Sequence, residues 1–278
     1  CSLVFLLTAT FERLYPGADL MVDHSIQSGG LFCHIRGMAI EDPIAFYANL
    51  EREMRATVAA DRPIERGLYA VDFAKKLFES RGQKEKYQLL NYRKKEFLAM
   101  YRLDDYIDYH YGYMVPSTGY LPYFEIQPSV EPSQFYLRFP KDGKSIEISP
   151  LKEDAMMLSQ FRIYGDWLAR LGIDSISSLN FAIEKDRIRE VILVSESFHS
   201  QQFSNLAERI ASMNPRPRVI LIAGPSSSGK TTFSKRLTIE LLVHGISPVP
   251  IEMDNFFVDR VLSPRDEKGD YDFEALEN

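Results

Sequence analysis

The chain has 278 residues, of which 45% are hydrophobic and 26% charged, and its formal net charge is −6. These values argue against a disordered chain and against nucleic-acid binding by bulk charge, and they allow two domains of ordinary size. The only cysteines are Cys1 and Cys33, which argues against a disulfide framework and a thiolate zinc site. No apolar run is long enough to span a membrane, so we expect a cytoplasmic protein without a membrane partner. Because it starts at Cys1 and stops at Asn278 in an acidic segment, we expect a fragment.

The first 90 residues are predicted to be largely helical. Apolar residues recur at helical spacing in the first segment, and Glu41-Asp42-Pro43 places acids and a proline at the start of another helix. One short apolar segment, Leu31–Ile35, reads as a strand. The predicted helices are Ser2–Tyr15, Glu41–Ala60, Val71–Ser80 and Gln83–Leu90.

Aromatic and β-branched runs then replace the helical pattern, which predicts a sheet. Turn-forming residues separate the runs, and Pro140–Gly143 marks their end. The predicted strands are Glu96–Leu103, Tyr106–Tyr113, Tyr123–Ile126 and Phe135–Phe139. A domain edge is expected near residue 145.

Beyond Pro150 the helical pattern returns over Glu153–Leu171, Ser175–Ala182 and Ile188–Met213. An apolar run at Arg218–Ala223 follows and is typical of a strand buried on both faces. A glycine-containing loop, a helix over Lys230–His244 and a second strand over Pro248–Met253 complete the order. This order predicts the start of a βαβ unit with a parallel sheet.

The loop Gly224–Thr231 matches the pattern GxxxxGK[ST] of a phosphate-binding loop. Its backbone N–H groups are expected to bind phosphate oxygens, with Lys230 at the β- and γ-phosphates and the Thr231 hydroxyl on Mg²⁺. The alternative is a Gly/Ser turn that joins a strand to a helix. The predicted ATP-binding residues are Gly224, Ser226, Ser227, Ser228, Gly229, Lys230, Thr231 and Thr232.

An acid, Asp254, stands at the end of the second predicted strand, where open α/β sheets bind ligands. It is therefore a candidate general base for an attacking hydroxyl, or a second-sphere ligand of Mg²⁺, with Lys230 as the other candidate catalytic residue. A helix cap or a turn is the alternative role for Asp254.

Three segments, Ile220–Thr232, Asp254–Phe257 and Asp270–Glu274, resemble the uridine kinase and phosphoribulokinase family. The resemblance implies that Asp254 is the general base and that Asp272 or Glu274 binds the ribose of the acceptor. Phe257 stands where the family has Tyr. The resemblance also implies that the fragment alone lacks activity, because the family's sheet needs further strands.

Residues 1–145 resemble the editing domain of threonyl-tRNA synthetase. The matching segments are Leu14–Gly17, Gly29–Phe32, Glu41–Pro43 and Val115–Gly119. The family's four editing-site positions, two on the first helix and two before the Val-Pro-Ser-Thr segment, fall here on Cys1, Phe5, His110 and Met114. Phenylalanine and methionine in place of two imidazoles imply that the hydrolytic machinery is lost.

Four tyrosines surround His110 in the predicted strand: Tyr106, Tyr109, Tyr111 and Tyr113. We interpret them as cross-strand aromatic pairs, with a base-stacking platform as the alternative.

The expected architecture is an α+β editing-like domain at 1–149, a helical connector at 150–216 and the start of an α/β P-loop kinase domain at 217–278. The leading functional hypothesis is ATP- and Mg²⁺-dependent phosphoryl transfer to a nucleoside or similar small molecule. The alternative is a nucleotide-binding switch with an RNA-recognising N-terminal module, for which the partner is a tRNA end.

Overall fold

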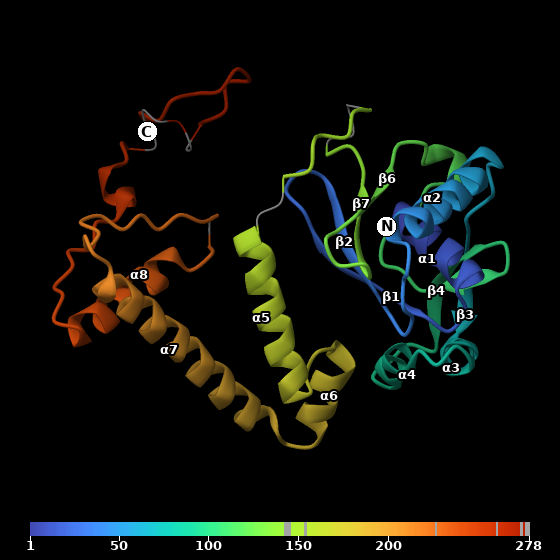
Figure 1. Ribbon diagram of the computed structural model, residues 1–278, viewed down its shortest axis with the longest axis horizontal. Coiled ribbons are helices and arrows are strands. Elements are labelled where there is room, and N and C mark those ends of the chain that lie inside the picture. The colour runs from blue at the N-terminus through green and yellow to red at the C-terminus, as the bar shows by residue number, and fades with distance from the viewer. Residues whose placement is uncertain (142–145, 153–154, 226, 260, 273–274, 276–278) are drawn as a thin grey trace. The chain divides into compact units, whose positions relative to one another are not determined.

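Two antiparallel sheets organise the N-terminal part of the chain in the computed structural model, which describes residues 1–141, 146–152, 155–225, 227–259, 261–272 and 275 (Figure 1). The chain divides into two compact units, Cys1–Lys185 and Asp186–Asn278. No helix within the described residues has both the length and the apolar character needed to cross a membrane.

The larger sheet has the strand order β1-β2-β7-β6, with every neighbouring pair antiparallel. Side chains alternate between its two faces, as the pleat requires. Cys33 and Ile35 of β2 point into the main core, whereas Phe32 points to the opposite face and packs on Tyr136. The strands are β1 (Asp19–Ser25), β2 (Gly30–Arg36), β6 (Glu125–Pro128) and β7 (Gln134–Arg138).

Helices α1 (Ser2–Leu14) and α2 (Pro43–Ala59) cover the core face of this sheet. The apolar stripe of α1 is fully buried at Phe5, Leu6 and Leu7. Helix α2 begins at Pro43, and its N-cap Asp42 accepts a hydrogen bond from the backbone N–H of Ala45 at 3.0 Å. Both helices were predicted from periodicity, and the structure confirms them.

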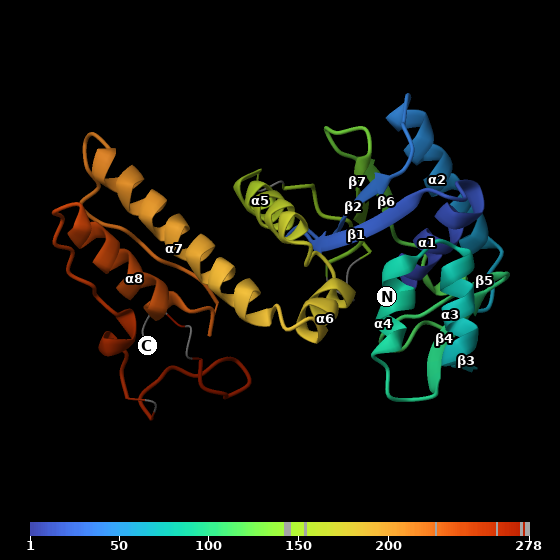
Figure 2. The same cartoon turned by 90° about the horizontal axis from the view of Figure 1, so that it is seen from below.

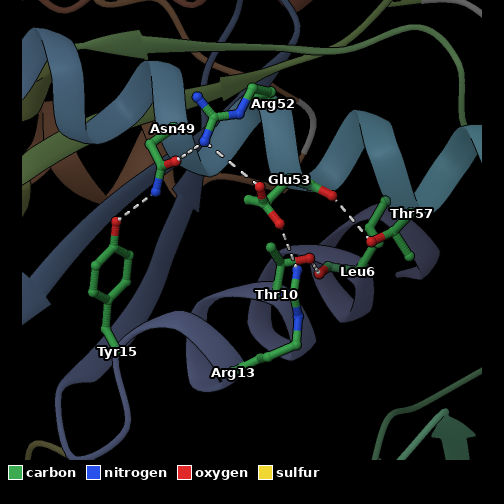
Figure 3. Close-up of polar contacts among 8 residues, drawn as sticks. All are labelled: Leu6, Thr10, Arg13, Tyr15, Asn49, Arg52, Glu53 and Thr57. Carbon is green, nitrogen blue, oxygen red and sulfur yellow. Dashed lines mark hydrogen bonds and ion pairs between the residues drawn. The ribbon is translucent and has the colours of Figure 1, made fainter.

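A chain of polar contacts joins α1 to α2 at the edge of this interface (Figure 3). Arg13 pairs with Glu53 at 3.2 Å, and Glu53 lies 3.6 Å from Arg52. Arg52 donates to the side chain of Asn49, whose amide donates to the Tyr15 hydroxyl at 3.3 Å. Because Arg13 and Arg52 are exposed and Glu53 is half-buried, these ion pairs orient the two helices more than they stabilise them.

The smaller sheet has the order β3-β4-β5, also antiparallel, and its apolar side packs against helices α3 and α4. The strands are β3 (Glu65–Ala70), β4 (Phe97–Leu103) and β5 (Tyr106–Asp108), and the helices are α3 (Val71–Ser80) and α4 (Lys84–Asn91). Strand β5 ends at Asp108, so the strand predicted to run to Tyr113 is too long. The 3₁₀ turn η1 (Thr118–Tyr120) follows.

Helix α5 (Ala155–Leu171) lies on the other face of the larger sheet, beside β1 in both views (Figures 1 and 2). Phe161 stacks on His24 with ring centroids 4.3 Å apart, and Arg162 donates to Gln134 at 2.7 Å. Helix α6 (Ile176–Glu184) then meets α4, where Tyr92 donates to Glu184 at 3.0 Å.

The unit Asp186–Asn278 is built on two packed helices, α7 (Ile188–Ser212) and α8 (Lys230–Val243), with the 3₁₀ turn η2 (Met253–Phe256) after them (Figure 2). Phe203 and Ala207 of α7 are buried against Leu237 and Leu241 of α8. The predicted connector helices are therefore present, and the division between units falls between α6 and α7.

The predicted parallel sheet of a P-loop kinase is not formed. Residues 218–223 and 248–252 are not strands, and 253 begins η2. Leu221 is 89% exposed and Val249 is 82% exposed. A strand exists only where a neighbouring backbone pairs with it, and both sheets within the described residues are antiparallel. The α+β class holds for the N-terminal unit, and the α/β expectation for residues 217–278 is corrected.

Candidate functional site

Phe5 occupies the centre of the candidate site and is fully buried. Three rings from the smaller sheet and the segment after it surround its own ring. Their centroids lie 6.3 Å away for Tyr101, 5.5 Å for Tyr106 and 5.4 Å for His110. The His110 ring meets Phe5 edge-on at 84°, a geometry that favours aromatic pairs. The structure thus brings Phe5 and His110 together, as the resemblance implied.

The other two positions of the quartet contribute no imidazole. Cys1 is the exposed N-cap of α1, and Met114 packs against the core cluster that contains Phe5. No group of three or more His, Cys, Asp or Glu side chains able to hold a metal is found among the described residues. At the position where the resemblance places a second histidine, this chain has the buried apolar ring of Phe5.

The imidazole of His110 is partly enclosed by this packing. Burial lowers the pKa of His110, and the nearby Lys86 ammonium lowers it further, while Asp108 acts in the opposite direction. The net effect favours the neutral form of the ring. A neutral imidazole can pack against a phenyl ring and donate one hydrogen bond.

Asp108, at the end of β5, is the most heavily bonded side chain near the site, and sequence reasoning missed it. It is almost fully buried and accepts from Lys86 Nζ at 2.6 Å, the Tyr106 hydroxyl at 2.6 Å and the Tyr109 N–H at 2.7 Å. Burial raises the pKa of this carboxyl, but these partners outweigh it and hold the pKa below its usual value. An acid inside an aromatic run was the available signal, because buried carboxylates need partners.

The Val-Pro-Ser-Thr segment is fastened to the helices beside the site. The N–H of Val115 donates to the Ser2 hydroxyl at 3.0 Å, which ties the segment to the start of α1. Thr118 is fully buried and donates to the carbonyl of Thr57 at 2.8 Å. The Gly119 N–H donates to Asp61 at 2.9 Å. This motif therefore has a structural role that positions the residues preceding it.

The tyrosines around His110 do not form cross-strand pairs, because the strand ends before three of them. Tyr109 and Tyr111 make a T-shaped contact with centroids 5.0 Å apart, and both lie beyond β5. Tyr111 and Tyr113 project into solvent. The interpretation as cross-strand pairs is therefore wrong for the rings after Asp108.

The loop before α8 has the backbone of a tight turn. Ser227 and Gly229 have φ of 60° and 84°, and Gly229 is the N-cap of the helix that begins at Lys230. Lys230 Nζ donates to the carbonyls of Gly224 at 2.9 Å and Pro225 at 3.0 Å. The Ser228 N–H donates to the Pro225 carbonyl at 3.2 Å. Thr231 and Thr232 follow in the exposed first turn of α8.

The remaining predicted site residues are placed only in part. Asp254 lies in η2, but its side chain is outside the described residues, as are Ser226 and Glu274. Asp272 donates its backbone N–H to the Pro264 carbonyl at 2.8 Å.

No protein-family model matches this chain. Similarity to curated proteins is found with threonine–tRNA ligases. The enzyme of Acidithiobacillus ferrooxidans is 33% identical over 129 residues, that of Marinobacter nauticus 31% over 128, and that of Oleidesulfovibrio alaskensis 28% over 127. Each match covers 45% of this chain and 19% of the relative, so the chain spans about a fifth of the relatives' length.

These relatives support a threonyl-tRNA-synthetase editing-like domain over 45% of the chain. They also correct the leading functional hypothesis. The relatives named above are threonine–tRNA ligases and not uridine kinases, and the parallel sheet that the kinase hypothesis requires is not formed within the described residues. Phosphoryl transfer to a nucleoside is therefore set aside, and the RNA-related alternative is favoured.

Proposed function

We propose that the unit Cys1–Lys185 is an RNA-recognising module that binds the acceptor end of a tRNA without hydrolysing anything attached to it. Threonine–tRNA ligases, with which it shares its similarity, act on tRNA by name. The observation that carries the second half of the proposal is the buried Phe5 ring, which lies against His110 where the resemblance places a second histidine.

The absence of hydrolysis follows from what the site lacks chemically. Hydrolysis of an ester requires a base or a metal-bound water next to the bond that breaks. Phe5 provides neither, and Met114 offers only a weakly accepting thioether. Among the described residues, the charged groups that act on His110 are Asp108, Lys86 and the N-terminal ammonium, and Asp108 and Lys86 already pair with each other at 2.6 Å.

Binding must rely on local contacts, because the net charge of −6 repels RNA at long range. We therefore expect a modest affinity that falls as salt is added, because each neutralised phosphate releases counterions.

We propose ATP with Mg²⁺ as the ligand of the loop Gly224–Thr232. The positive φ at Ser227 and Gly229 favours inward-pointing N–H groups, and α8 presents its positive end there. Lys230 is already positioned over this turn, and the exposed Thr231 hydroxyl is available for the metal. In this proposal, bound ATP changes the affinity of the chain for RNA and thereby acts as the switch.

The test uses the whole 278-residue chain and a 5′-fluorescein acceptor-stem hairpin with a single-stranded 3′ end. Fluorescence anisotropy is expected to show binding at low salt, while an aminoacylated tRNA keeps its amino acid during incubation. Addition of ATP and Mg²⁺ is expected to change the RNA affinity of the native chain but not of the Lys230→Ala variant. Absence of RNA binding at low salt, or rapid deacylation, would contradict the proposal.

A further inference from the structure

We infer that Tyr111 and Tyr113 form a stacking platform for unpaired bases at the 3′ end of the bound RNA, with Arg66 placed for an adjacent phosphate. This inference rests on the proposed function and names the surface that performs it. Tyr111 is 77% exposed and Tyr113 is 88% exposed, the two largest exposed fractions among the described aromatic side chains of this unit.

The segment that carries the two tyrosines is anchored at both ends. On one side, the Tyr109 N–H donates to the buried Asp108 carboxylate at 2.7 Å. On the other side, the Val115 N–H donates to Ser2 at 3.0 Å. A platform held in this way loses little conformational freedom when a base stacks on it.

A third anchor lies between the two rings. The buried Tyr101 of β4 donates its hydroxyl to the Gly112 carbonyl at 2.7 Å. Gly112 adopts φ of 83°, a left-handed conformation that a glycine accepts without strain, and this turn separates Tyr111 from Tyr113. Buried core residues thus hold the backbone in place while both rings remain in solvent.

The charge next to the platform has the sign that RNA requires. The Arg66 guanidinium lies 5.9 Å from the centre of the Tyr113 ring, within range of a cation–π contact. The neighbouring guanidiniums of Arg62 and Arg102 have carboxylate partners, Asp104 and Glu65. Within the described part of the chain, Arg66 has no such partner, so its charge is available to a phosphate.

An unpaired nucleic-acid strand matches this combination better than a folded protein surface does. Single-stranded RNA is bound by aromatic rings on which bases stack and by nearby cations that contact the backbone. Every base has a π-face, so the two tyrosines can stack on bases of any sequence without specific hydrogen bonds. The charge of Arg66 adds an attraction to phosphate that the net acidic chain otherwise lacks.

The experiment compares the whole chain with its Tyr111→Ala and Tyr113→Ala variants. The probes are a 5′-labelled hairpin with about four unpaired 3′ nucleotides, one of them 2-aminopurine, and the same hairpin with a blunt end. Each variant is expected to bind the overhang probe about tenfold more weakly and to lose quenching of 2-aminopurine. Tyr113→Phe keeps the ring and is expected to keep the affinity.

Tyr164→Ala is the matched control, because Tyr164 is an exposed tyrosine of the same unit on α5, over the larger sheet. It is expected to bind as the native chain does. If the native chain binds the overhang probe and both tyrosine variants match it, the platform is wrong while the proposed function stands. If the native chain binds neither probe, the proposed function fails and the platform with it.

Discussion

A single side chain, Phe5, decides the chemistry available at the candidate site. Its ring is fully buried and contacts Tyr106 and His110 at centroid distances of 5.5 and 5.4 Å. An imidazole at this position would have to satisfy its nitrogens inside an aromatic cluster, which is costly without partners. The phenyl ring instead adds to the core. At this position the chain therefore has a packing residue and no reactive group.

Asp108 has the strongest electrostatic role near the site, and its contribution to the free energy of unfolding is expected to depend on pH. The pKa of the Asp108 carboxyl is lower in the folded chain than in the unfolded chain, where it is about 3.9. The charged carboxylate therefore contributes its full stabilisation above a pH of about 3.9, and this contribution is lost as the pH falls through the folded pKa. We predict that Asp108→Asn lowers the free energy of unfolding at pH 7 by on the order of 2 kcal/mol. The difference in the free energy of unfolding between the Asp108→Asn variant and the native chain is expected to become smaller toward pH 3.

Urea unfolding followed by Trp167 fluorescence at several pH values measures this difference. Asp105→Asn, an exposed change three residues earlier, is the control and should leave the unfolding free energy nearly unchanged. A pH-independent gap for Asp108→Asn would show that the carboxylate charge is not what stabilises this region.

At the scale of elements, the join between β2 and β7 depends on a close backbone approach. Arg138 of β7 is fully buried and donates to the carbonyls of Ser28 and Gly29 at 3.3 and 2.9 Å, and to the side chain of Gln127 at 3.3 Å. It thereby fixes the turn before β2 to two other strands. Most N–H groups of the Arg138 guanidinium donate to carbonyl oxygens and not to a carboxylate, so this side chain has a structural role and holds these segments together.

Gly30 lies opposite Arg138 in this join and provides a matched test. A Cβ at Gly30 would come within 2.6 Å of the Leu137 carbonyl oxygen, whereas one at Gly17 would meet nothing within 4 Å. Both glycines have positive φ, 135° and 90°, so an alanine at either costs about 1–2 kcal/mol in strain. Gly30→Ala is expected to cost about 1–3 kcal/mol more than Gly17→Ala because of the overlap.

Chemical denaturation of the two variants measures the comparison directly. If both variants lose the same free energy of unfolding, β2 and β7 can move apart to accommodate the Gly30→Ala methyl group without a cost in stability, which would contradict the prediction.

On the scale of the whole molecule, the two units have separate cores. The core of Cys1–Lys185 lies between α1, α2 and the sheets, while that of Asp186–Asn278 consists mainly of side chains from α7 and α8. The single tryptophan, Trp167, belongs to α5 of the first unit. Its fluorescence therefore reports on that unit alone.

We predict that Leu237→Ala, in the buried interface of α7 and α8, lowers the stability of the second unit by about 2–5 kcal/mol. Helical circular dichroism should show an earlier transition, while the urea midpoint of Trp167 fluorescence stays unchanged. Leu242→Ala, at an exposed position of α8, is the control. A shift of the Trp167 midpoint with Leu237→Ala would reveal that the two units unfold as one.

The sequence by itself determined the helices and the local motifs. Helix α3 begins and ends as predicted, and α1, α2 and α8 differ from their predicted bounds by one or two residues, because helical hydrogen bonds join residues close in sequence. The turn before α8, with positive φ at Ser227 and Gly229, was likewise readable, since it depends on the residues at those positions.

Only the tertiary structure decided where strands form and which side chains meet. Strands β1 and β3 were not predicted, and the apolar run at 218–223 is no strand, because a strand depends on a partner that the local pattern does not contain. The same reason explains the site. Asp108 is buried beside Tyr106, and its ion pair with Lys86 joins residues that are 22 positions apart in the sequence. Tyr113 lies in solvent because strand β5 ends before it, and the pairing with β4 sets where β5 ends.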